Sequence, residues 1–81
     1  PMVERFWVRR GIAHQENNEY PEALACYAVA SNLNTANPLN NFFSAECYAK
    51  IMDLASARAE IETGKKIIQE QQLEDNPQIK H

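Results

Sequence analysis

The fold is decided by the stretch Trp7-Val8-Arg9-Arg10-Gly11-Ile12-Ala13-His14, which has a counterpart 34 residues further along the chain. That counterpart is Asn41-Phe42-Phe43-Ser44-Ala45-Glu46-Cys47-Tyr48. The same offset places Ala23 over Ala57 and Tyr27 over Ile61, so small residues coincide with small ones and large apolar residues with large apolar ones. Self-similarity at a fixed period indicates a repeated supersecondary unit. We therefore expect the second half of the chain to fold as the first half does.

The offset and the residue types resemble the tetratricopeptide pattern, a helix-turn-helix whose sequence runs Trp-x2-Leu-Gly-x2-Tyr and later Ala-x3-Phe. The first copy departs from it at Arg10 and His14, and the second has Asn41 in place of the Trp. Small residues recur where two helices of such a hairpin cross closely, and larger side chains would push the helices apart. These residues are Gly11, Ala23, Ala45 and Ala57. The pattern predicts an all-α fold of four helices, in which two tetratricopeptide-like hairpins form a short superhelical array. The alternative is a generic helical bundle with Ala-rich seams.

Local signals predict helices over 4–17, 21–34, 38–51 and from 54 to the low seventies. Asn17-Asn18 can adopt the left-handed conformation that ends a helix, and Pro21 suits a first helical turn. Asn37 and Asp53 are N-cap candidates for the last two helices. We expect one domain over 1–81, with repeats at about 4–37 and 38–71, a frayed tail at 75–81, and Trp7 largely buried against the second helix.

Size and composition limit what the chain can do alone. It has 81 residues and a net charge of −3, with acids and bases interspersed, so no basic patch indicates a nucleic-acid partner. The apolar stretches are too short for a membrane span, and the first residues lack the pattern of a secretory leader, which favours the cytoplasm. Two repeats bury little surface, since about three are normally needed for stability. We expect a longer parent chain, self-association or a bound partner to supply the rest.

The sequence contains no group of residues whose types and spacing predict a catalytic site. Cys26 and Cys47 have no CxxC spacing, so free, partly buried thiols are favoured over a disulfide or a metal pair. His14 stands where the repeat places a ring, which favours a packing role over a catalytic base. The serines lack a Gly-flanked turn, and two glycines cannot form a phosphate loop. The sequence predicts no enzyme, no cofactor and no metal site.

A binding groove is the better hypothesis. At 100° per residue, one face of the first helix carries Val8 and Ile12, and the equivalent face of the third helix carries Leu39 and Phe42. Exposed apolar groups in a groove mark an interaction site, although they could instead pack against a missing repeat or a symmetry mate. The expected partner-binding residues are Arg5, Val8, Arg9, Ile12, Leu39, Phe42, Glu46 and Lys50.

A more specific resemblance rests on Glu19-Tyr20-Pro21-Glu22-Ala23, Cys26-Tyr27, Asn37-Pro38, Phe43, Ala45-Glu46-Cys47, Asp53-Leu54, Ala57 and Glu60. These residues look like those of the class II translocator chaperones of bacterial type III secretion. The resemblance covers about residues 5 to 70 and implies a non-enzymatic chaperone of the bacterial cytoplasm. It implies that the groove grips an extended segment of a secreted translocator or effector and keeps that protein soluble, and that a homodimer or a second chaperone could contribute.

Departures from that family leave other functions open. The family's N-terminal helix and an earlier repeat are not in this sequence, and Asn17-Asn18 and Ile51-Met52 replace the Gly usual in the family's turns. A generic tetratricopeptide adaptor is the alternative. A carboxylate-clamp adaptor would need a cluster of Lys, Arg and Asn in the groove, and only Arg5, Arg9 and Lys50 are available there. An enzyme or an enzyme regulatory domain is the third hypothesis.

Overall fold

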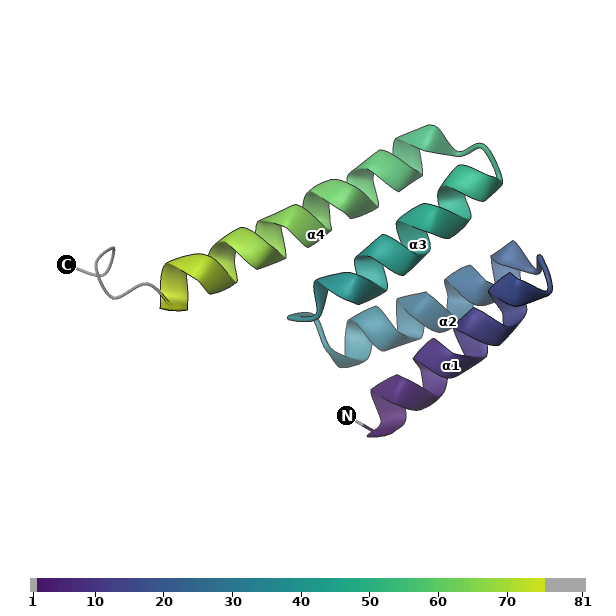
Figure 1. Cartoon of the computed structure of the whole chain (residues 1–81), viewed down its shortest axis with the longest axis horizontal. Helices are drawn as coiled ribbons and strands as arrows, with labels where there is room; N and C mark the ends of the chain where they lie inside the picture. The colour runs from purple at the N-terminus through teal and green to yellow at the C-terminus, as the bar shows by residue number, and fades with distance from the viewer. Residues whose placement is uncertain (1, 76–81) are drawn as a thin grey trace.

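A computed structural model describes residues 2–75, and every element in that part of the chain is an α-helix. The helices are α1 (Met2–Glu16), α2 (Tyr20–Leu33), α3 (Pro38–Lys50) and α4 (Leu54–Asp75) (Figure 1). The predicted all-α array of two helical hairpins is confirmed. At the turns between helices, each predicted helix end lies within two residues of the observed one. The tail predicted to fray lies, beyond Asp75, outside the described residues.

The four helices form a linear array in which each packs against its neighbours in sequence: α1 on α2, α2 on α3 and α3 on α4. Figure 1 shows the two hairpins stacked in one direction, with the end of α4 projecting past α3. The array measures 49 × 30 × 16 Å. Two stacked hairpins leave an outer helix at each end, α1 and α4, with one side uncovered.

The backbone of the two hairpin turns repeats at the 34-residue offset. The Glu19 N–H donates to the His14 carbonyl over 2.8 Å, and the Asp53 N–H donates to the Tyr48 carbonyl over 2.9 Å. Three further pairs of equivalent backbone hydrogen bonds occur at the same offset. Their N–H donors are residues 17 and 51, residues 18 and 52, and residues 23 and 57. The sequence repeat is therefore also a repeat of backbone conformation.

Caps at the helix N-termini follow the sequence signals. The Asn37 side chain accepts from the Leu39 N–H over 3.1 Å. Asp53 accepts from the Ser56 hydroxyl over 2.7 Å and from the Ser56 N–H over 3.1 Å, and these bonds lower the pKa of the Asp53 carboxyl. Pro21 and Pro38 stand in the first turns of α2 and α3, where the missing N–H costs nothing.

Left-handed backbone ends both first helices of the hairpins, at Asn18 (φ 61°) and at Met52 (φ 67°). Asn tolerates this conformation, whereas a long side chain pays about 1–2 kcal/mol for it. Because the Met52 side chain is exposed, little packing offsets that cost.

We expect Met52→Gly to raise the free energy of unfolding by about 1 kcal/mol, since glycine removes the steric cost of the turn but adds chain entropy to the unfolded state. Asn18→Gly is the matched control at the equivalent turn and should change stability less. Urea unfolding followed by circular dichroism measures both. A lower stability for Met52→Gly would contradict the left-handed turn.

The core lies where the two hairpins meet. Ala23, Tyr27 and Cys47 are fully buried, and the Tyr27 ring stacks on the Phe43 ring at a centroid distance of 5.1 Å. The four small residues expected at close helix crossings, Gly11, Ala23, Ala45 and Ala57, are all buried. A close crossing is clearest at Gly11, where an added Cβ would lie 2.5 Å from Cε1 of Tyr27.

The expectation that Trp7 would be largely buried is wrong in degree, because Trp7 is only partly buried. Its ring meets the Phe6 ring edge to face at 5.5 Å, and the Arg10 guanidinium lies 5.6 Å from its centre. Two residues of its own helix thus contact the Trp7 ring, which remains partly exposed.

Candidate binding groove

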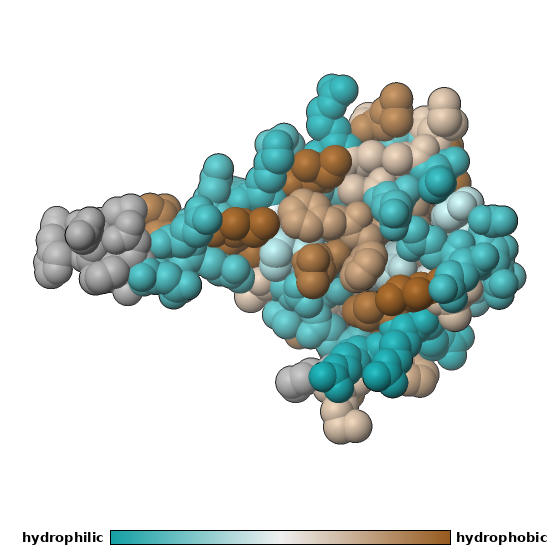
Figure 2. All heavy atoms as spheres, in the orientation of Figure 1, coloured by the Kyte–Doolittle hydropathy of each residue, from teal (hydrophilic) through white to brown (hydrophobic). Residues whose placement is uncertain are grey.

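The first helices of the two hairpins, α1 and α3, share one face of the molecule. Figure 2 shows apolar side chains gathered in the middle of this face, with hydrophilic side chains around them. Two hollows lie along the face, and residues from both helices line each of them. We call this face the α1–α3 groove.

The first hollow, of about 260 Å³, lies between the N-terminal halves of α1 and α3. Its apolar lining comes from Val8, Leu39 and Phe43, and Arg5 supplies its cation. The remaining lining residues are Glu4, Asn37 and Asn40. This end of the groove can accept an apolar side chain next to a positive charge.

The second hollow, of about 450 Å³, lies near the C-terminal ends of the same helices. Ile12 and Phe43 are apolar parts of its lining, and Glu16, Glu46 and Lys50 are its charged groups. Gln15, Asn18 and Tyr20 complete it. The first hollow has one carboxylate, Glu4, beside its cation, whereas the second has two carboxylates beside one cation, so the second is the more negative of the two.

Phe43, not Phe42, is the aromatic residue of α3 that lines the two hollows, so the structure does not place Phe42 in the groove, where the sequence analysis expected it. An added Cβ on Gly64 would clash with the Phe42 ring, which therefore packs between α3 and α4. Phe43 is one residue, or about 100°, further round the helix and lines both hollows. The sequence contained a signal for this placement of Phe42, because Gly64 in the facing helix α4 leaves space for a large ring on α3.

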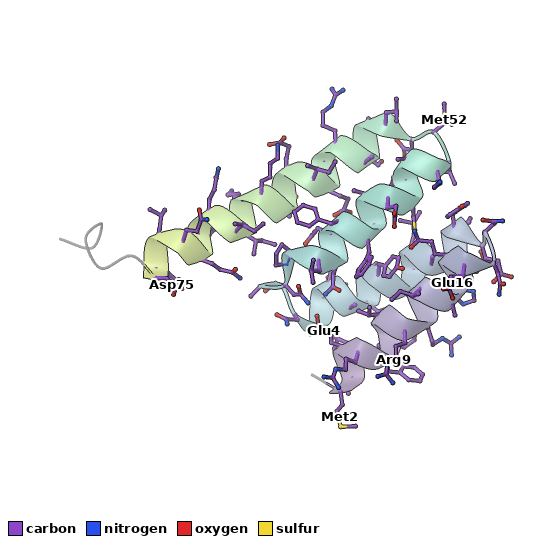
Figure 3. The ribbon with its side chains drawn as sticks, in the orientation of Figure 1. Met2, Glu4, Arg9, Glu16, Met52 and Asp75 are labelled. Atoms are coloured by element: carbon purple, nitrogen blue, oxygen red, sulfur yellow. The ribbon has the colours of Figure 1, made fainter. Side chains whose placement is uncertain are left out.

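The structure brings together six of the other predicted groove residues and separates one. Arg5, Val8, Ile12, Leu39, Glu46 and Lys50 line the two hollows. Arg9 instead lines a separate hollow on the outer side of α1, together with Phe6 and Arg10. Figure 3 shows Arg9 and Met2 at the edge of the molecule away from α3 and α4.

Gln15 connects the groove to the core, a role that the sequence did not indicate. Its amide donates to the Glu46 carboxylate over 2.6 Å and its carbonyl oxygen accepts from the Tyr27 hydroxyl over 2.7 Å. The bond to Glu46 ties α1 to α3 across the groove and holds the Glu46 carboxylate, and the bond from Tyr27 ties α1 to α2. The spacing between the two groove walls is therefore set partly by Gln15.

Glu4 is a second connection that sequence reasoning missed. Its carboxylate accepts from the side-chain amides of Asn34, Asn37 and Asn40 over 2.9, 2.8 and 2.9 Å. These bonds, with that from Asn34 the largest contribution, lower the pKa of the Glu4 carboxyl below its ordinary value of 4.5. Asn40 is fully buried, and its Oδ1 has no hydrogen-bond partner within residues 2–75. Glu4 thus fastens the start of α1 to the α2–α3 connection and to α3.

The two cysteines and His14 are not among the residues that line the two hollows. Cys26 and Cys47 are free and buried, and burial, with a smaller contribution from the Glu46 charge, raises the pKa of the Cys47 thiol to about 11. That thiol is protonated at neutral pH, which makes it a poor nucleophile. His14 Nδ1 lies 2.9 Å from the Glu19 carboxylate beside the α1–α2 turn. Within the described part of the chain, His, Cys, Asp and Glu form no group of three that could hold a metal.

Comparison of the chain with protein-family models, with curated proteins and with solved structures gives no match. None of the helices in residues 2–75 combines the length and apolarity that a membrane crossing requires. The geometry of the groove is therefore the main guide to function.

Proposed function

We propose that the chain is a tetratricopeptide-like binding module of the class II translocator chaperone type. It holds an extended, partly apolar segment of a secreted translocator or effector in the α1–α3 groove and keeps that protein soluble and ready for export. The module acts in the bacterial cytoplasm and is not an enzyme.

One observation carries the proposal: two structurally equivalent helices present adjacent apolar hollows that share Phe43. Leu39 is 57% exposed and Ile12 37% exposed, so both offer apolar surface to a ligand at little cost to the fold. An extended segment spaces alternate side chains about 6.5–7 Å apart on one face, which suits two neighbouring hollows.

The residues that carry the family resemblance divide into two groups. Ala45 and Cys47 are buried and Asp53 caps α4, so they support the array. Glu46 lines the groove. The resemblance therefore supports the proposed architecture more strongly than any particular cargo, and the identity of the cargo depends on groove residues such as Leu39 and Ile12.

Calorimetric titration with overlapping synthetic peptides that tile a type III translocator protein tests the proposal. We expect Leu39→Ala to weaken the best peptide by about 1–2 kcal/mol, since the side chain would be buried by the ligand. Leu54→Ala is the matched control, because Leu54 is 58% exposed but lies on α4, away from the groove. Equal binding by both folded variants and the unmodified chain would contradict the groove, and no binding by any peptide would contradict the chaperone assignment.

A further inference from the structure

The second hollow of the α1–α3 groove contains two carboxylates without a cationic partner. Glu16 comes from α1 and Glu46 from α3. No ion pair within residues 2–75 includes either of them. Lys50 lines the same hollow one helical turn after Glu46, and it too forms no ion pair in that part of the chain. Both carboxylates are therefore available to a cation of a ligand.

The Glu46 carboxylate is held in place by a chain of hydrogen bonds that starts in the core. The Tyr27 ring is fully buried and stacked on Phe43, and its hydroxyl donates to Gln15 over 2.7 Å. The Gln15 amide donates in turn to Oε1 of Glu46 over 2.6 Å. Oε2 of Glu46 accepts no hydrogen bond from residues 2–75 and can accept one from a ligand. Because an acceptor fixed in advance loses less conformational entropy on binding, this arrangement favours a ligand with a donor at this point.

The ends of two helices also shape the electrostatic potential of the second hollow. α1 ends at Glu16 and α3 ends at Lys50, on the same side of the array (Figure 1). The last carbonyls of a helix carry a partial negative charge, so a carboxylate at the end of α1 is unfavourable for that helix. Lys50, in the last turn of α3, offsets the dipole of its own helix. The end of α1 therefore adds its partial negative charge to that of the two carboxylates.

The Tyr27 hydroxyl responds to this negative potential. Burial is the largest cause that raises its pKa above the ordinary value, and the charges of Glu46 and Glu16 are among those that raise it further. Both carboxylates thus act on the same point in the core, behind the second hollow.

The apolar part of the second hollow suits the stem of a basic side chain. Ile12 and the Phe43 ring belong to its lining, and its volume is about 450 Å³. Lysine and arginine lay their methylene stems on apolar surface and keep the charged end among polar groups. The walls of the hollow belong to α1 and α3, so a further helix stacked on the outer side of α1 or of α4 would leave it unfilled.

We propose that the second hollow binds a basic side chain, lysine or arginine, of the segment held in the groove. The methylene stem lies over Ile12 and Phe43, and the cation pairs with Glu46 and Glu16. This assignment rests on the proposed binding of an extended segment in the groove, and it adds the chemical class of one side chain of that segment. Since the first hollow accepts an apolar side chain, the cargo is narrowed to segments with an apolar and a basic side chain on alternate positions.

The probes are short acetylated and amidated peptides with a leucine and a variable residue on alternate positions of a serine and glycine background, in both orders. The variable residue is lysine, norleucine or glutamate. Norleucine has the methylene stem of lysine without the ammonium group, so the difference between these two peptides isolates the charge. None of the peptides derives from a translocator, which makes the test independent of the chaperone assignment.

In ¹⁵N–¹H correlation spectra of the full chain at low salt, the lysine peptide should bind about three- to tenfold more tightly than the norleucine peptide, and the glutamate peptide most weakly. Amide shifts caused by the lysine peptide should include those of Ile12, Phe43 and Glu46. The double variant Glu16→Gln, Glu46→Gln should abolish the preference for lysine. Glu70→Gln, Glu74→Gln is the matched control and should retain it, because it removes the same charge from a separate hollow beside α4.

Glu16→Gln alone should lower the preference for lysine while it leaves the hydrogen bonds of Gln15 in place, and circular dichroism checks that every variant remains helical. Equal binding of the lysine and norleucine peptides would overturn the proposal, as would no shift with millimolar lysine peptide. A preference that survives the Glu16 and Glu46 changes, or that the control loses equally, would overturn it as well. Binding of the lysine peptide at the second hollow, with no binding of any translocator peptide, would support the basic-side-chain site and contradict only the chaperone assignment.

Discussion

Gly11→Val should cost about 3 kcal/mol of folding free energy, at the upper end of the range for overpacked cores. A Cβ at this position would lie 2.5 Å from Cε1 and 2.8 Å from Cδ1 of Tyr27. The ring cannot move aside easily, because it stacks on Phe43 and its hydroxyl donates to Gln15. Since small domains have about 5–15 kcal/mol in total, the loss is a large fraction of the stability of the chain.

Urea or thermal unfolding of Gly11→Val and Gly64→Val provides the measurement, because the Phe42 ring lies against Gly64 as Tyr27 lies against Gly11. Both variants should lose a similar amount. Ala13→Val is the control, since it adds the same branched side chain at an exposed position of α1. A loss at Gly11 no larger than that at Ala13 would show that the helices do not cross closely there.

Glu4→Ala should cost about 2–3 kcal/mol at pH 7. The change removes a carboxylate that accepts three amide hydrogen bonds and leaves the buried Asn40 amide without its partner. Contact of the carboxylate with solvent keeps the loss below the sum of three charged hydrogen bonds. Glu16→Ala, on the exposed side of the same helix, is the control and should change stability by less than about 0.5 kcal/mol.

The contribution of Glu4 should depend on pH in a defined direction. Its pKa is lower in the folded chain than the ordinary value of 4.5, so the ionised carboxylate stabilises the fold above that value. The stabilisation is lost as pH falls below 4.5 and through the lower folded pKa. The stability difference between the unmodified chain and Glu4→Ala should therefore narrow in acid, and a difference that widens as pH falls would contradict the three hydrogen bonds to an ionised Glu4.

Repetition made most of the fold predictable. The 34-residue offset located both hairpins, and Gly11 located a close helix crossing. Asn37 and Asp53 identified caps because a side chain that accepts from the first turn acts locally. Backbone chemistry within a few residues and a repeated pattern can both be interpreted without knowledge of the tertiary structure.

The candidate site was predictable only to within one helical position. The 100° spacing of helical residues predicted Phe42 in the groove. The Phe42 ring instead packs against Gly64 between α3 and α4, and Phe43 lines the groove. The side-chain hydrogen bonds between distant residues were not foreseen. Glu4 and Asn34 are 30 residues apart, and Gln15 and Glu46 are 31 apart, so no local spacing connects them.

The most direct test of the central proposal is to locate the bound segment on the chain. In ¹⁵N–¹H correlation spectra recorded during titration with the tightest translocator peptide, amide shifts should concentrate within residues 5–16 and 39–50. Signals from the exposed side of α4, including Leu54 and Arg58, should move little. Shifts concentrated along α4, with the signals of Ile12, Leu39 and Phe43 unmoved, would contradict the assignment of the α1–α3 groove as the binding site.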